Sequence, residues 1–258
     1  MKILFNDILQ NNFTPPELIS PALSDTYTFG DESLIIPINK PSPIDCVGIG
    51  NCSVDKIKII ATKKLTVIDG GNAYYVNDGT QISGGNASHN GGSLIDAAIT
   101  DTFLINYQED GLYLLDKNDS LYTSIEIIVP KNTKIGRIAL GKAVNIPTSI
   151  AKEPGFFTTA ESRHTLSGQV IAGVGGYNYR ALSLDSRYKI NKMAMKELEA
   201  GYSKIAAGYP FFINLSDESY KLPFDKLYAT EKNQNAMSFE GGIRYFLYSR
   251  RWFFKEAF

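Results

Sequence analysis

Two strand-forming runs flank a turn in the stretch Thr102-Phe103-Leu104-Ile105-Asn106-Tyr107-Gln108-Glu109-Asp110-Gly111-Leu112-Tyr113-Leu114-Leu115. β-Branched and aromatic residues favour strands, and an Asp-Gly step marks a turn. Similar pairs of strand-forming runs around a turn recur through the first half of the chain, where no segment has a convincing helical pattern. The predicted strands lie at 33–37, 55–61, 65–68, 102–107, 112–115 and 122–129, with turns at 69–72, 77–79, 109–111 and 117–119. This pattern is typical of an antiparallel sandwich or jelly roll, which we expect over residues 1–134.

The second half differs, because one helix interrupts its strands. Apolar residues recur there at three- and four-residue spacing, which predicts a main helix over about residues 190–207. The stripe consists of Ile190, Ala194, Leu198, Tyr202 and Ile205, and Gly208 and Pro210 follow it. We expect strands at 135–141, 209–215, 226–230 and 243–254, a hairpin of 165–172 with 177–184, and a proline-containing connection at 145–155. Residues 135–258 are thus predicted to form a smaller α+β domain, and the chain as a whole to be mainly β.

The two halves carry opposite charge. Residues 1–134 hold 9 Lys and Arg against 16 Asp and Glu, a net charge of −7, whereas residues 135–258 hold 17 against 11, a net charge of +6. All seven arginines and 20 of the 30 aromatic residues lie in the second half. Because Arg and aromatic residues concentrate in protein interfaces, we expect the second half to contain a docking surface.

The strongest interaction signal is Arg250-Arg251-Trp252-Phe253-Phe254, in the last predicted strand. Alternate residues of a strand face opposite sides, so both faces carry an aromatic ring there, and we expect the small core of this half to cover only one. The predicted interface residues are Arg137, Arg180, Arg244, Arg250, Arg251, Trp252, Phe253 and Phe254. A charge of only +6 favours a protein partner over a nucleic acid.

No catalytic, cofactor or metal motif stands out. His89 and His164 lie in no zinc-binding frame, and Gly173-Val174-Gly175-Gly176 lacks the third glycine of a dinucleotide fingerprint. Residues 116–127 resemble the start of a calcium loop but have Leu121 and Ile127 where that loop needs Gly and Glu. We therefore expect no enzyme, no cofactor and no metal, although a structural calcium ion held by carbonyl oxygens stays an alternative.

Cys46 and Cys52 flank a glycine-rich segment that we read as a turn region. Their spacing is not that of a redox or zinc site, so we expect two reduced structural thiols, with a hairpin disulfide as the alternative. The Gly- and Asn-rich segment 81–93 is expected to be an exposed loop, with glycan contact as the alternative. Apolar runs fall short of the roughly 20 residues that a membrane helix needs, and the first residues become polar too early for a signal peptide.

Several short motifs together resemble a bacteriophage pattern. They are Ile135-Gly136-Arg137-Ile138-Ala139-Leu140-Gly141-Lys142, Ser167-Gly168-Gln169, Tyr179-Arg180-Ala181-Leu182-Ser183-Leu184 and Tyr209-Pro210-Phe211-Phe212-Ile213. The chain is similar over about residues 30–230 to tail- and baseplate-associated virion structural proteins with an N-terminal galactose-binding-like β-sandwich. The resemblance implies a non-enzymatic building block with no catalytic residue to transfer.

The expected function is therefore assembly of a virion, with the chain made in the host cytoplasm. We expect other virion proteins as partners, and copies of this chain in a ring that pairs the acidic half of one with the basic half of the next. The main alternative is a carbohydrate-binding module that recognises a host glycan through the sandwich. A polysaccharide-degrading enzyme and a protein that contacts packaged DNA are weaker alternatives.

Overall fold

The computed structural model describes residues 1–5, 7–11, 14–68, 74–75, 81–82, 94–115, 120–146, 150–158, 163–164, 170–171, 178–190, 196, 198–199, 201, 208–216, 224–231, 238–240 and 246–257. Within these residues the chain is mainly β, its sheets are antiparallel, and there is almost no helix. The fold class expected from the sequence is confirmed at this level.

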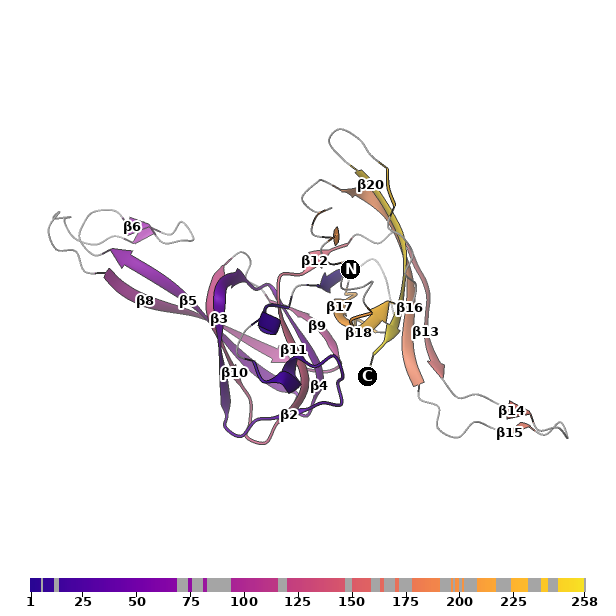
Figure 1. The fold of residues 1–258 in the computed structure, drawn as a ribbon, viewed down its shortest axis with the longest axis horizontal. Coiled ribbons are helices and arrows are strands. Elements are labelled where there is room, and N and C mark those ends of the chain that lie inside the picture. Colours follow the sequence, from indigo (N-terminus) through magenta and orange to yellow (C-terminus); the bar gives the residue numbers. More distant parts are fainter. Residues whose placement is uncertain are drawn as a thin grey trace.

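Two four-stranded sheets form a sandwich (Figure 1). One sheet has the order β3 (Ser33–Pro43), β10 (Leu121–Ile128), β5 (Lys56–Ile68) and β8 (Leu94–Asn106). The other has the order β2 (Tyr27–Thr28), β11 (Lys134–Gly141), β4 (Cys46–Cys52) and β9 (Gly111–Leu114). Strand β5 is longer than predicted, because it joins the runs 55–61 and 65–68 into one element.

The pairs in this sandwich are nested along the chain. Strand β5 pairs with β8, β4 with β9, β3 with β10, and β2 with β11. The pairs β10–β5 and β11–β4 then join these ribbons into the two sheets. The chain thus passes through β2, β3 and β4 to the β5–β8 hairpin, and it returns through β9, β10 and β11, each of which pairs with its counterpart.

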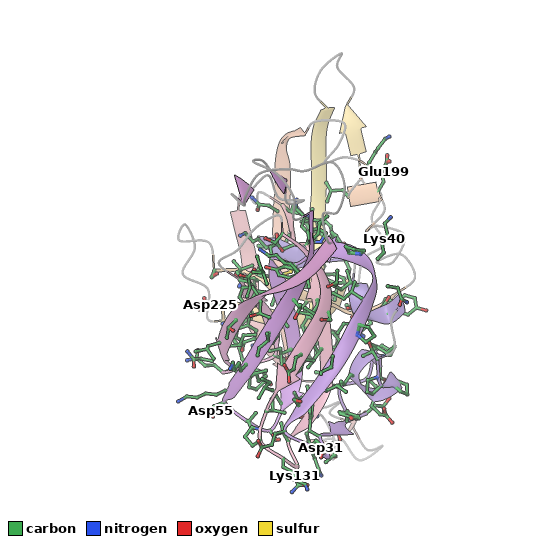
Figure 2. All side chains as sticks on the ribbon, turned by 90° about the vertical axis from the view of Figure 1, so that its left-hand side faces the viewer. Asp31, Lys40, Asp55, Lys131, Glu199 and Asp225 are labelled. Carbon is green, nitrogen blue, oxygen red and sulfur yellow. The ribbon has the colours of Figure 1, made fainter. Side chains whose placement is uncertain are left out.

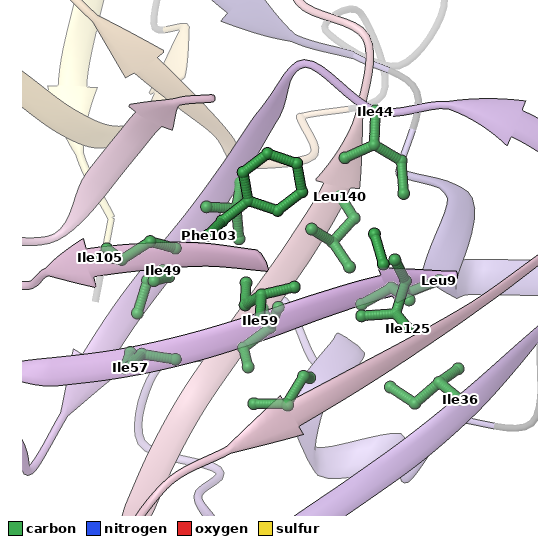
Figure 3. Close-up of a cluster of buried hydrophobic side chains, with 14 of the residues drawn as sticks. Leu9, Ile36, Ile44, Ile49, Ile57, Ile59, Phe103, Ile105, Ile125 and Leu140 are labelled. Atoms are coloured by element: carbon green, nitrogen blue, oxygen red, sulfur yellow. The ribbon is translucent and has the colours of Figure 1, made fainter. Parts of the chain in front are cut away.

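Alternating burial along the strands builds the core between these sheets. In β10 the side chains of Tyr122, Ile125 and Ile127 are fully buried, while Thr123, Ser124, Glu126 and Ile128 are only half-buried. Figure 3 shows Ile36, Ile59, Phe103 and Ile125 of the first sheet in one cluster with Ile49 and Leu140 of the second. Charged side chains such as Asp31, Asp55 and Lys131 are exposed at the periphery (Figure 2).

An eight-stranded sheet lies beside the sandwich (Figure 1). Its order is β12 (Val144–Asn145), β1 (Lys2–Leu4), β17 (Phe211–Asn214), β18 (Lys226–Glu231), β20 (Phe246–Glu256), β16 (Asn178–Ile190) and β13 (Ile150–Thr158), with β19 (Ser238–Glu240) on β20. Two smaller ribbons pair β6 (Tyr74–Tyr75) with β7 (Gln81–Ile82) and β14 (Arg163–His164) with β15 (Val170–Ile171). Two 3-10 turns, η1 (Ile8–Asn11) and η2 (Pro16–Ile19), follow β1.

Strand β17 is buried on both faces, which explains its unbroken apolar sequence. Phe211 and Ile213 join one core cluster with Trp252, Phe254 and other residues of the large sheet. Phe212 faces the other way and joins Cys46, Leu112 and Ala139 of the sandwich. The second cluster is the joint between the sandwich and the large sheet, and we use that name for it below.

The boundary between the sandwich and the large sheet does not fall between residues 134 and 135, where the sequence suggested it. Strand β11, expected in the second half, pairs with β4 in the sandwich, whereas β1 pairs with β17 in the large sheet. Strands β1 and β20, from the two ends of the chain, both belong to the large sheet. Each of the two predicted units therefore contributes a strand to the sheet of the other.

Two other pairings differ from the sequence prediction. Strand β16 pairs with β13 and β20, and β15 pairs with β14, so the expected hairpin of 165–172 with 177–184 is wrong. Part of the expected connection 145–155 is strand β13. Its register shifts between Lys152 and Gly155, around Pro154, which has no N–H to donate to a ladder and is tolerated at a bulge of an edge strand.

The predicted main helix over 190–207 is not confirmed. Ile190, its first expected residue, is the last residue of β16 and pairs with Phe246. Helical backbone is found at Lys196, Leu198, Glu199 and Gly201, and Leu198 is buried in the core of the large sheet. The other residues of that segment lie outside the described residues, as do 83–93 of the predicted exposed loop, of which Gln81–Ile82 form strand β7.

The segment between the two cysteines is strand β4, where we expected a turn. Its Gly48 lies against the ring of Phe212, and a Cβ at this position would be 2.1 Å from Cδ2 of that ring. A glycine is therefore needed so that β17 can approach β4. The glycines of this strand reflect close packing at the joint.

We predict that Gly48→Ala lowers the free energy of unfolding by about 1–3 kcal/mol, because the added methyl group forces Phe212 out of its position. Gly30→Ala is the matched control, since a Cβ there has no heavy atom within 4 Å, and it should stay within about 0.5 kcal/mol of wild type. Urea unfolding of both variants measures the difference. Equal stability of the two would contradict the close-packing account.

Candidate functional site

Arg137 lies at the centre of the joint. It projects from β11, and only 5% of its surface is exposed. Its Nη1 donates to the carbonyl oxygen of Ser20 at 3.1 Å and to Oη of Tyr228 at 3.2 Å. Tyr228 in turn donates to the carbonyl oxygen of Pro21 at 2.8 Å. One guanidinium thus connects the sandwich, the segment after η2 and the large sheet.

The charge of Arg137 is balanced by Asp7. Nη2 of Arg137 lies 3.9 Å from Oδ2 of Asp7, and both side chains are buried. Oδ1 of Asp7 accepts hydrogen bonds from the backbone N–H groups of Leu9 at 3.0 Å and Leu140 at 3.2 Å. A buried charge needs such compensation to be tolerated.

A cavity of about 410 Å³ adjoins this ion pair. Its walls are mostly apolar and come from β1, β11, β17 and the two 3-10 turns. The lining residues are Leu4, Phe5, Asp7, Gln10, Ile19, Arg137, Ala139, Tyr209, Pro210, Phe211 and Phe212. A concave apolar site with a few polar groups is the usual form of a small-molecule site.

Arg180 makes a second connection between the sandwich and the large sheet. Its Nη1 lies 2.6 Å from Oε2 of Glu109, which follows β8, and its Nε donates to Oε1 of Glu256 at 2.8 Å. Its Nη1 also approaches the carbonyl oxygen of Lys226 at 3.3 Å. Burial lowers the pKa of Arg180, but hydrogen bonds and charge from Glu256 and Glu109 outweigh this and raise the pKa overall. Arg180 is held as a cation between two carboxylates.

The C-terminal strand contributes to the core. Trp252 and Phe254 are 1% and 0% exposed and stack with ring centroids 5.6 Å apart. Alternation along the strand is as predicted, since Arg251 is exposed and Phe253 half-buried on the opposite face. We expected the core of this half to cover only one face of this strand. The Trp252 face is covered, because Trp252 and Phe254 join the core cluster of the large sheet.

The predicted interface residues are therefore not one surface. Arg137, Arg180, Trp252 and Phe254 make contacts inside the chain, as described above. Arg251 and Phe253 lie on the opposite face of β20, Arg250 is in β20 opposite Ser186, and Arg244 lies outside the described residues. A docking role stays a prediction for the residues of β20 that face away from the core.

Both cysteines are free thiols, as predicted. Sγ of Cys46 lies 3.2 Å from the carbonyl oxygen of Gly141, and Sγ of Cys52 lies 3.3 Å from that of Val54. Burial raises the pKa of both thiols. They stand at opposite ends of β4, so the strand itself keeps them apart.

The described residues contain no group of three or more His, Cys, Asp or Glu side chains arranged to hold a metal ion. They also contain no helix that is long and apolar enough to cross a membrane. Residues 116–119 of the calcium-like run, and His89, lie outside the described part of the chain.

Comparison with protein-family models, with curated proteins and with solved structures finds no match to this chain.

Sequence reasoning missed the joint and its cavity, although one signal pointed to them. Arg137 interrupts the otherwise apolar strand from Ile135 to Gly141, and such a strand is buried on both faces. An arginine in that context must be paired inside the protein. Its partner Asp7 is 130 residues away in the sequence, so no local pattern could identify it.

We predict that Arg180→Met lowers the free energy of unfolding by about 2–3 kcal/mol, because Glu109 and Glu256 are then left facing each other without a cation. The side chains are 14% to 28% exposed, which keeps the loss below that of a fully buried pair. Arg251→Met, at an exposed position of the same sheet, should cost less than about 1 kcal/mol. Chemical denaturation measures both, and similar losses would argue against the Arg180 connection.

A further prediction concerns alkaline pH. Burial raises the pKa of Tyr228 to about 12, although the charge of Arg137 lowers it. The neutral phenol is therefore favoured in the fold: its contribution to stability is complete below the unfolded pKa of about 10 and is lost as the pH rises from about 10 to about 12. Tyr228→Phe should reduce the slope of the unfolding free energy over this interval by up to about 1.4 kcal/mol per pH unit. Urea unfolding across the interval tests this, and parallel slopes would rule it out.

Proposed function

We propose that this chain is a non-enzymatic structural subunit of a bacteriophage virion, of the tail or baseplate kind, that works by docking to other virion proteins and to copies of itself. We also propose that its sandwich is a jelly roll and that a smaller α+β part with one main helix adjoins it. The nested pairing of β2 with β11, β3 with β10, β4 with β9 and β5 with β8 supports the jelly roll, because it is a single long ribbon folded into two sheets.

The observation that carries the docking proposal is a two-stranded arm. Strand β10 pairs with β5 only from Lys58 to Thr62, whereas β8 follows β5 as far as the pair Ile68 and Leu94. Residues 63–68 and 94–99 therefore extend beyond the sheet as a ribbon of two strands, and we call this the arm. Figure 1 shows the β5–β8 hairpin projecting away from the sandwich.

An arm of this kind is incomplete in isolation. Two strands alone are marginally stable in water, and both outer edges of the ribbon present backbone N–H and C=O groups. Contact with another subunit satisfies such groups and adds the missing packing. Ile99 at the base of the arm is 46% exposed, which gives a partner an apolar contact.

The root of the arm is fixed by buried polar contacts. Nζ of Lys63 lies 3.0 Å from Oδ2 of Asp101, and Oη of Tyr122 donates to the same oxygen at 2.8 Å. Asp101 and Tyr122 are 5% and 0% exposed. The arm therefore leaves the sandwich in a defined direction, as a docking element must.

We predict that the wild-type chain self-associates at low ionic strength and dissociates as salt is added, because its halves carry opposite charge. Ile99→Asn on the arm should weaken the association at least about tenfold, which corresponds to roughly 1.4 kcal/mol. Ile35→Asn is the matched control, because Ile35 is 64% exposed on β3, where it pairs with Glu126 within the four-stranded sheet. Sedimentation velocity over a range of salt concentrations measures the association.

A monomer at both low and high ionic strength would contradict the self-association. Association that Ile99→Asn leaves intact would remove the arm as the contact. The virion assignment is tested separately by quantitative mass spectrometry of purified particles, where a fixed copy number is expected. Binding of a glycan by the full chain, without a place in a particle, would favour the carbohydrate-binding alternative.

A further inference from the structure

The cavity beside Arg137 has the features of a small-molecule site that is separate from the arm. It lies between the sandwich and the large sheet, and Ala139 of β11 and Phe211 and Phe212 of β17 are among the residues that line it. Leu4, Phe5, Ala139, Phe211 and Phe212 are buried. The walls are thus set by the cores on both sides and form a defined shape.

The mouth of the cavity is open to solvent. Tyr209 and Gln10 line it and are exposed, and Tyr209 is 58% exposed. Pro210 follows Tyr209 and limits the backbone at the rim. A molecule can therefore enter past an aromatic residue into a cavity that Asp7 and Arg137 also line.

Arg137 lines the cavity and carries several hydrogen-bond donors. Its Nη1 is occupied by Ser20 and Tyr228, and its Nη2 faces Asp7. Among the described residues, its Nε donates no hydrogen bond, although it is buried. Buried donors are nearly always satisfied, so an acceptor atom in the cavity would complete this guanidinium.

The charge of the site determines what kind of molecule fits. Asp7 lies 3.9 Å from Nη2 of Arg137, so the pair is close to neutral as a whole. An ion of either sign therefore gains little net Coulomb attraction from the pair, and it would lose its hydration against apolar walls. A neutral molecule does not meet this penalty.

We propose that this cavity binds a small neutral molecule with an apolar, ring-sized body and one oxygen acceptor. The oxygen accepts a hydrogen bond from Nε of Arg137, and the body packs against Phe211, Phe212 and Ile19. The site does not depend on the virion role, since it is built from contacts within one chain.

p-Cresol and toluene are the test pair, because they share the ring and methyl group and differ by one hydroxyl. Titration of the full-length chain, followed by NMR chemical shifts and by calorimetry, should show saturable binding of p-cresol. Its affinity should exceed that of toluene about tenfold, the effect of one satisfied hydrogen bond. Comparable affinities would overturn the role of Arg137, and no saturable binding of either would overturn the site.

Variants locate the binding. Arg137→Lys keeps the positive charge but has no Nε–H, so it should remove the preference for p-cresol while toluene still binds. Tyr209→Ala changes only an exposed rim residue and should weaken both ligands several-fold. Leu104→Ala, at a position that is 77% exposed on β8, is the control and should leave both affinities unchanged.

If Arg137→Lys does not fold, the p-cresol to toluene ratio in the wild type and the loss in Tyr209→Ala still decide the matter. Unchanged binding in Tyr209→Ala would place the ligand elsewhere and refute the proposal.

Discussion

The buried guanidinium of Arg137 is the constraint on which the rest of this structure depends. A permanent cation with 5% of its surface exposed must be compensated wherever it lies. Compensation requires Asp7, the carbonyl oxygen of Ser20 and Tyr228 at the same time, and these come from three separate parts of the chain. An arrangement that separated these groups would leave the guanidinium without these partners. The contribution is mainly to specificity, because the net stability of a buried ion pair is small even when its loss is costly.

Close packing around the guanidinium follows from the same constraint. The guanidinium carbon lies 5.6 Å from the ring centroid of Tyr228 and 6.0 Å from that of Phe212, so both rings must reach β11. Phe212 comes close enough only because its other neighbour, Gly48, has no side chain. At this contact the sandwich contributes the small residues Gly48 and Ala139, and the large sheet contributes the rings of Phe212 and Tyr228. The cavity remains where these shapes do not fill the space beside the ion pair.

The sequence predicted the local structure better than the pairing. Runs such as 122–129 can be recognised as strands, because their apolar residues alternate or are continuous. Most of the runs predicted in this way are strands in the structure. Their partners are set by distant contacts: β1 closes the large sheet against β17, more than 200 residues later, which no periodicity can indicate. Cys46–Cys52 was misread because glycine marks both turns and close backbone approach. Trp252 and Phe254 were assigned to the docking surface for a related reason, since they have the composition of an interface and of a core alike.

The charge asymmetry of the chain has a different meaning once the ion pairs are known. The sequence suggested that acidic and basic halves attract each other between subunits. Two of the arginines instead pair with acids of the first half inside the same chain: Arg137 with Asp7, and Arg180 with Glu109. Both pairs cross from the sandwich to residues near the large sheet or its connections, so the complementarity first serves to dock the two layers within one molecule. Surface charges outside these pairs, and the arm that leaves the sandwich at Asp101, are where we propose that a neighbouring subunit binds.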